Sequence, residues 1–171
     1  MGRTMRLLLG TGAALATMLT AAPAAAAAPA PAVAAAAAPA GCRDNGGREI
    51  DTPFFNTDLN DVQVCIEQAP TGEYRATVTG FYTDGGDGSR KFDRLAVTVR
   101  IEQAGKFQIA TNTCEKTREV NATPNGSLQC SVEGEPIGGG AITADGFITY
   151  NIDADGEGDL HWSLHGSPPE R

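Results

Sequence analysis

A two-residue alternation of apolar and polar side chains runs through most of the chain after residue 60. It is clearest at residues 95–101, where every second side chain is a large aliphatic one. Successive side chains of a strand point to opposite faces, so this period predicts half-buried β-strands. It recurs at 62–66, 74–82, 107–109, 128–132, 148–152 and 160–164. The sequence therefore predicts an all-β protein, and we expect no helix after Gly41.

Short polar segments rich in Gly, Asp and Asn separate these runs. They lie at 84–88, 104–106, 124–126, 138–140, 145–146 and 155–156. These residues favour tight turns because Gly has no side chain to clash and Asn and Asp can hydrogen-bond the local backbone. Short strands at near-regular spacing favour an antiparallel sandwich. We therefore expect an antiparallel immunoglobulin-like β-sandwich of roughly seven or eight strands.

The first 40 residues have a different composition. Arg3 and Arg6 precede a mostly apolar run, and small residues follow it. This order is typical of a secretory signal, and the run is shorter than the roughly 20 apolar residues of a membrane helix. We expect a signal peptide over residues 1–28, with several possible cleavage sites, and no stable membrane insertion. An Ala/Pro-rich disordered tether over 29–41 and a single secreted β domain over 42–171 would follow.

The expected mature domain is acidic. All 21 acidic residues lie after residue 40, and removing Arg3 and Arg6 from the 13 basic residues leaves 11, a net charge of 11 − 21 = −10. Such a surface repels nucleic acid, so we expect no nucleic-acid partner. It also keeps an extracellular domain in solution, where we expect a monomer.

The cysteines predict a disulfide framework. Cys42, Cys65, Cys114 and Cys130 form an even set after an export signal, as in proteins of oxidising compartments. Three pairings are possible. We favour Cys42–Cys65 and Cys114–Cys130, because the members of each pair are close in sequence and the pairs are far apart. The second bridge would clamp the mouth of a hairpin, and the wide spacing disfavours a zinc site.

Four alternating acids raise the question of calcium. Asp153, Asp155, Glu157 and Asp159 lie in a Gly-containing tip, and residues 151–156 match the opening of an EF-hand loop. The match fails at the twelfth position, where Trp162 replaces the required Glu. A weak calcium site built from these four acids is one interpretation, and an acidic turn is the other. We expect no other cofactor.

The chain shows little that predicts catalysis. It has no G-x-S-x-G motif and no phosphate-binding loop. His161 and His165 lie on either side of Ser163, and on a strand they would stand about 13 Å apart, too far to share one metal ion. We expect no catalytic residues and no enzyme. A hydrolase with two carboxylates facing each other across a cleft is a less favoured alternative.

The predicted function is that of a secreted non-enzymatic binding or accessory domain of unknown ligand or protein partner. Loops at the ends of a clamped sandwich are the usual place for such contacts. Asn121, Asn125 and Ser127 are the possible loop contacts, because they surround a turn between two cysteines. The alternative is an extracellular protease inhibitor that presents the 119–128 loop, held rigid by a disulfide.

The Ala- and Pro-rich leader and the tail from Tyr150 to Pro168 resemble those of short exported actinobacterial proteins. This resemblance covers only the two ends and implies secretion without a catalytic activity. In expected architecture the mature part is similar to the apoproteins of enediyne chromoproteins, which are acidic and secreted and contain two disulfides. The disulfides of that family close shorter loops than any pairing available here, and a shared fold does not imply a shared function.

Overall fold

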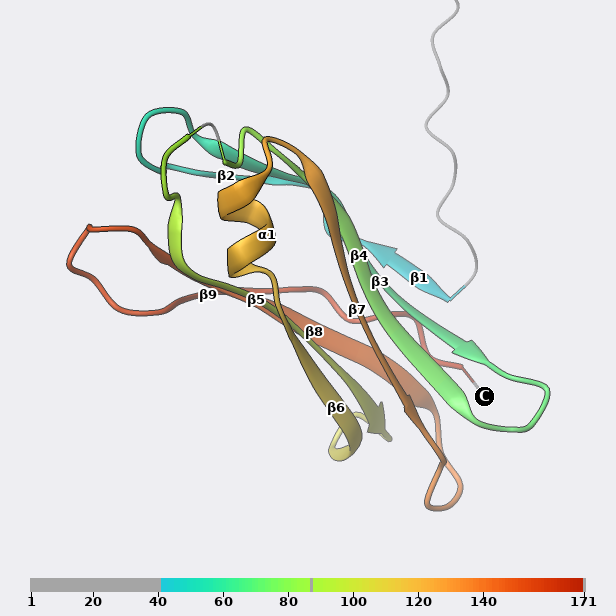
Figure 1. Cartoon of the computed structure of the whole chain (residues 1–171). Coiled ribbons are helices and arrows are strands. Elements are labelled where there is room, and N and C mark those ends of the chain that lie inside the picture. Colours follow the sequence, from blue (N-terminus) through green and yellow to red (C-terminus); the bar gives the residue numbers. More distant parts are fainter. Residues whose placement is uncertain (1–40, 87, 171) are drawn as a thin grey trace, which may run out of the picture. The chain divides into compact units, whose positions relative to one another are not determined.

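Nine strands form two antiparallel sheets in the computed structural model, which describes residues 41–86 and 88–170 (Figure 1). The first sheet has the order β1-β3-β4-β7, and β2 also pairs with β3. The second sheet has the order β6-β5-β8-β9. The first contains β1 (Cys42–Asp44), β2 (Arg48–Ile50), β3 (Thr57–Gln68), β4 (Tyr74–Thr83) and β7 (Gly126–Gly134). The second contains β5 (Phe92–Gln103), β6 (Phe107–Glu115), β8 (Ile142–Ile152) and β9 (Leu160–Ser163).

The all-β antiparallel sandwich is thus confirmed. The structure has nine strands, more than the expected seven or eight, because β1 and β2 have only three residues each and show no alternation. The immunoglobulin-like connectivity stays a prediction. The predicted signal peptide and tether lie outside the described residues except for Gly41, whose carbonyl accepts a hydrogen bond from the Ile66 amide at 2.9 Å.

The core lies between the sheets and follows from the alternation. Leu95, Val97, Val99 and Ile101 of β5 are all fully buried, and β4 buries every second side chain from Tyr74 to Tyr82. Burying an aliphatic side chain stabilises the fold by about 1.5–3 kcal/mol relative to leaving it exposed. The period read from the sequence therefore also identifies the outward-facing residues of each strand.

A short helix contradicts the expectation that no helix follows Gly41. Helix α1 (Thr117–Ala122) has six residues and lies in the connection between β6 and β7 (Figure 1). Its Val120 is fully buried, and the Thr117 hydroxyl accepts a hydrogen bond from the Leu95 amide at 2.8 Å. Six residues are too few to show a helical period, so only tertiary contacts reveal this helix.

Both expected disulfides are confirmed, but the role expected for one of them is wrong. Cys42 and Cys65 are register partners on β1 and β3. Cys114 lies on β6 and Cys130 on β7, in different sheets. The second bridge therefore joins the two sheets and does not clamp a hairpin, because α1 carries the chain from one sheet to the other.

On the side of the sandwich away from the Cys114–Cys130 bridge, Asn45 links the first sheet to the segment that follows β9. The Asn45 side-chain oxygen accepts a hydrogen bond from the His165 amide, and its NH₂ group donates to the His165 carbonyl at 3.2 Å. Further on, Glu170 and Ile142 exchange backbone hydrogen bonds in an isolated bridge. Each open side of the sandwich is thus closed by contacts between the sheets.

None of the described helical residues form a segment of the length and apolarity needed to span a bilayer.

A candidate binding surface on the outer face of one sheet

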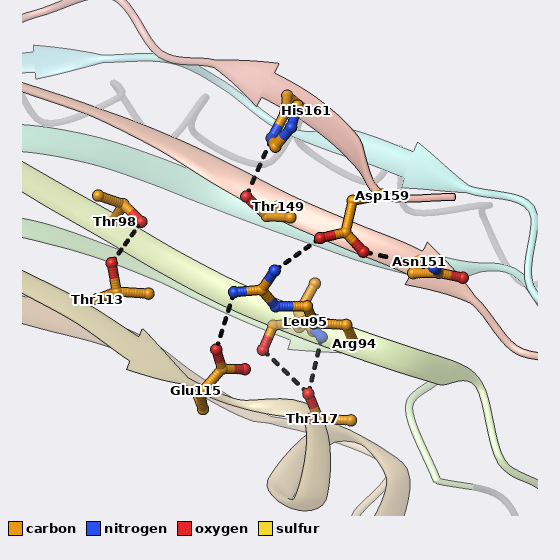
Figure 2. Close-up of polar contacts among 10 residues, drawn as sticks. All are labelled: Arg94, Leu95, Thr98, Thr113, Glu115, Thr117, Thr149, Asn151, Asp159 and His161. Atoms are coloured by element: carbon orange, nitrogen blue, oxygen red, sulfur yellow. Dashed lines mark hydrogen bonds and ion pairs between the residues drawn. The ribbon is translucent and has the colours of Figure 1, made fainter. Parts of the chain in front are cut away.

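The outer face of the second sheet holds a network of paired polar side chains, in which the buried side-chain oxygen of Asn151 is the one member atom without a hydrogen-bond partner among the described residues (Figure 2). Arg94 on β5 donates to Asp159 at 2.6 Å and to Glu115 at 3.1 Å, and Asn151 donates to the other oxygen of Asp159 at 3.4 Å. The hydrogen bond from Arg94 lowers the pKa of Asp159, and the same bond raises the pKa of Arg94. One guanidinium thus pairs with two carboxylates, and its hydrogen bonds to them are made within the sheet.

Neighbouring side chains on this face are paired as well. The hydroxyls of Thr98 and Thr113 lie 2.9 Å apart, and the Thr149 hydroxyl lies 3.0 Å from Nδ1 of His161 (Figure 2). His161 is therefore part of a structural contact between β8 and β9. This face is held together by its own side chains.

The four acids proposed for calcium do not converge in the structure. Asp159 is bound by Arg94, and Asp153 forms an ion pair with Arg90 at 3.2 Å. Asp155 accepts a hydrogen bond from the amide of Glu157 at 2.8 Å within its own turn. Across the described part of the chain, no three His, Cys, Asp or Glu side chains are grouped as metal ligands. A weak calcium site at this tip stays a prediction.

The segment from 119 to 128 is not the loop that the sequence suggested. It begins within α1 and ends in β7, so only a short turn separates the two elements. The Asn121 side chain is also hydrogen-bonded within the fold. Its oxygen accepts hydrogen bonds from the amides of Lys91 at 2.8 Å and Phe92 at 3.0 Å. Its NH₂ group donates to the Phe92 carbonyl at 2.8 Å. Asn121 attaches α1 to the start of β5. A protease-inhibiting role of this segment stays a prediction.

Asn125 and Ser127 lie instead beside an exposed aromatic ring on the first sheet. Ser127 is the register partner of Phe81, whose exposed fraction is 56%, and both residues line the same hollow as Asn125. The adjacent Gly126 pairs with Tyr82 and packs on it so closely that a Cβ would lie 2.7 Å from its ring. A glycine is thus required for β7 to approach β4 at this position.

A β-bulge in β3 adds a carboxylate to the same face. The register of β3 against β4 shifts between Asn60 and Gln63, so Asp61 and Val62 together oppose Gly80. Asp61 has φ of 50°, in the left-handed region that Asp tolerates better than most residues. The bulge leaves Val62 in the core and turns Asp61 outward. Bulges often redirect a side chain in this way.

The next row of the sheet is made of amide and hydroxyl groups. Gln63, Thr79 and Gln129 are register partners across β3, β4 and β7. They line a hollow of about 480 Å³ that also reaches Asp61 and Phe81. We call this surface the Phe81 face; it comprises Asp61, Gln63, Thr79, Phe81, Asn125, Ser127 and Gln129.

The polar groups of the Phe81 face are unpaired. Within the described residues, the side chains of Asp61, Gln63 and Gln129 make no hydrogen bond or ion pair. The same holds for Asn125 and Ser127. This contrasts with the second sheet, where arginine and threonine side chains pair with their neighbours. The Phe81 face combines free hydrogen-bonding capacity with an exposed apolar ring.

The sequence contains one feature that points to this site, the position of Phe81 in its strand. Tyr74, Ala76, Val78 and Tyr82 alternate on the buried face, so Phe81 has to point the other way. An aromatic residue at an outward-facing position of a strand, where polar residues are usual, indicates an exposed binding surface. Asp61 carries no comparable signal, because a bulge breaks the period that would place it.

Neither a protein-family model, nor a curated protein, nor a solved structure matches this chain.

Proposed function

We propose that this chain is exported and acts as an extracellular, non-enzymatic binding domain whose ligand lies on the Phe81 face. The observation that carries the proposal is the 56% exposed ring of Phe81 beside Asp61, Gln63, Asn125, Ser127 and Gln129, whose side chains have no hydrogen-bond or ion-pair partner among the described residues. Ligand sites combine apolar contact area with a few polar groups that orient the ligand. This face offers both on a rigid sheet.

Export is supported by the leader and by the cysteines. Arg3 and Arg6 before an apolar run are typical of a secretory signal, and all four cysteines of the domain are paired. Disulfides persist in oxidising compartments outside the cytoplasm. A monomer in free solution fits the strong negative charge of the domain.

Binding without catalysis is supported by the titratable groups that the face contains. Asp61 is the one carboxylate among the described residues lining the two hollows, and they include no histidine. Hydrolysis by carboxylates uses two such groups on opposite sides of the scissile bond. A single exposed carboxylate is suited to accepting hydrogen bonds from a ligand.

The test is capture by the full chain with both disulfides formed. The wild-type protein, Phe81→Ala and Phe107→Ala are immobilised and exposed to concentrated culture medium of the native host. Phe107 is a matched control, because its ring is also exposed but lies on β6 of the other sheet. A component retained by the wild type and Phe107→Ala, but not by Phe81→Ala, supports the proposal. Retention that is equal in all three, or absent in all three, contradicts it.

A further inference from the structure

We infer that the ligand of the Phe81 face is a neutral carbohydrate chain. This inference rests on the proposed binding function and adds the chemical class of the ligand. It follows from four properties of the face: its ring, its amides, its charge and its length.

The ring supplies an apolar platform. Phe81 is flanked in register by Asn60 on β3 and Ser127 on β7, so polar side chains border it on both sides. A pyranose has one face made largely of C–H groups, and its hydroxyls project around the edge. Such a face packs on an aromatic ring while the hydroxyls remain available to neighbouring polar groups.

The amides match hydroxyl groups. Gln63 and Gln129 are separated across the sheet only by Thr79, and each carboxamide both donates and accepts hydrogen bonds. A hydroxyl also does both, so an amide can satisfy it in either orientation. Phosphates and carboxylates only accept, and ammonium groups only donate, so they would use half of this capacity. Asn125 and Ser127 extend the same chemistry to the other side of Phe81.

The charge of the face disfavours ionic ligands. Among the described residues, no lysine or arginine lines either hollow, and Asp61 would repel an anion. The whole chain has a net charge of −8, which adds to this repulsion. Cation recognition through aromatic rings typically uses a cage of several rings, whereas the hollows share the single exposed ring of Phe81. An uncharged ligand is left as the best match.

The length of the face favours a chain over a single sugar. One hollow covers the row of Gln63, Thr79 and Gln129, and the other reaches Thr83 and Asn125. Both include Phe81 and Ser127, so they meet at the ring. From Thr79 to Thr83 the strand advances about 13 Å. Because both hollows lie open on the sheet surface, the face can hold an internal stretch of a polymer.

The test is electrophoresis of the native full chain, disulfides intact, through gels containing soluble polysaccharides. The neutral probes are hydroxyethyl cellulose, xylan, galactomannan and dextran, and the anionic ones are polygalacturonate and hyaluronate. We expect at least one neutral gel to retard the wild type. Phe81→Ala should weaken that binding on the order of tenfold or more, and Gln129→Ala by roughly threefold to tenfold. Phe107→Ala should bind like the wild type.

Two controls test whether the binding depends on ionic contacts and whether the variants are correctly folded. About 0.5 M salt should leave binding to a neutral polymer unchanged, because no ion pair is screened. Phe81 and Gln129 both point outward, so their variants should keep the unfolding midpoint of the wild type. The inference is overturned if no neutral gel retards the wild type, if Phe81→Ala is retarded equally, or if only the anionic gels bind.

The capture experiment separates this inference from the proposed function. Phe81-dependent capture from medium without retardation by any neutral polysaccharide would overturn the carbohydrate assignment and leave the binding domain standing. Failure of both experiments would overturn both. Retardation by a neutral polysaccharide that Phe81→Ala abolishes would support both.

Discussion

At the scale of single residues, a buried lysine organises one end of the sandwich. Lys91 is fully buried, and its ammonium donates to the carbonyls of Pro53 at 2.7 Å and Phe55 at 2.9 Å. A buried cation is tolerated only when hydrogen bonds replace its hydration. These two bonds hold the turn in which Phe54 takes a φ of 72°, an unusual value for a bulky residue. The backbone of this turn therefore depends on a side chain 36 residues beyond Phe55.

Replacing this lysine tests that dependence. Lys91→Met keeps much of the aliphatic stem but leaves two carbonyls without their charged donor. We expect the free energy of unfolding to fall by about 2–3 kcal/mol, measured by urea denaturation. Lys106→Met is the control, because Lys106 is exposed and its side chain makes no hydrogen bond or ion pair among the described residues. Equal stability of the two variants would show that the carbonyl bonds of Lys91 do not stabilise the turn.

At the scale of secondary-structure elements, Arg94 links three parts of the second sheet. It lies on β5 and binds Glu115 at the end of β6 and Asp159 just before β9. The hydrogen bond from Arg94 lowers the pKa of Asp159. Ionised Asp159 therefore stabilises the fold above its unfolded-state pKa, and that contribution is lost as the pH falls through the lowered folded-state pKa.

The pH dependence of Asp159→Asn checks this contribution. The variant should be less stable than the wild type at neutral pH, by a small amount because the pair is partly exposed. The difference should disappear in acid, where Asp159 of the wild type is protonated. Asp51→Asn is the control, because Asp51 is exposed and has no ion pair among the described residues. A difference that stays constant down to acid pH would contradict the role of ionised Asp159.

The two disulfides should affect different strands. Cys114–Cys130 joins the edges of the two sheets, whereas Cys42–Cys65 lies within one sheet. Replacing either pair by alanine should cost about 3 kcal/mol in unfolding free energy, because their sequence separations of 16 and 23 residues are similar. Hydrogen exchange should quicken along β6 and β7 in the first variant and along β1 in the second. The same exchange pattern in both would contradict the separate roles.

At the scale of the whole molecule, the sandwich is closed on both sides by contacts that cross between the sheets. Cys114–Cys130 and the hydrogen bond from Asn112 to the Ser131 carbonyl at 2.9 Å close the β6–β7 side. On the other side, Asn45 forms two hydrogen bonds with the backbone of His165. Polar side chains here replace the backbone pairing that would close a barrel.

Asn45→Ala tests the second closure. Loss of both hydrogen bonds should reduce the unfolding free energy by about 1–2 kcal/mol and speed hydrogen exchange at His165. Asn125→Ala is the matched control, since Asn125 is exposed and its side chain is unpaired among the described residues, and it should change stability by less than about 0.5 kcal/mol. Unchanged exchange at His165 in Asn45→Ala would show that this contact does not close the sandwich.

Much of the fold, but little of the candidate site, was predictable. The alternation in β5 identified both its faces, and sequence proximity identified both disulfide pairs. Of the three possible loop contacts, Asn125 and Ser127 lie beside Phe81, whereas Asn121 is turned toward the backbone of Lys91 and Phe92. All three have similar polar side chains in one short segment, so their different roles depend on which neighbours the fold brings to them.

By itself the sequence determined that the chain forms strands and which side chains of the long, regular strands face the core, and it favoured the cysteine pairing that the structure has. These properties are local, because they follow from a two-residue period and from short distances along the chain. Only the tertiary structure decided that Cys114 and Cys130 lie in different sheets, that Asp61 is turned outward by a bulge and that the side chains of Gln63, Ser127 and Gln129 lack partners among the described residues. These properties depend on strands that are distant in sequence, because a polar side chain is paired or free according to the residues that pairing places beside it.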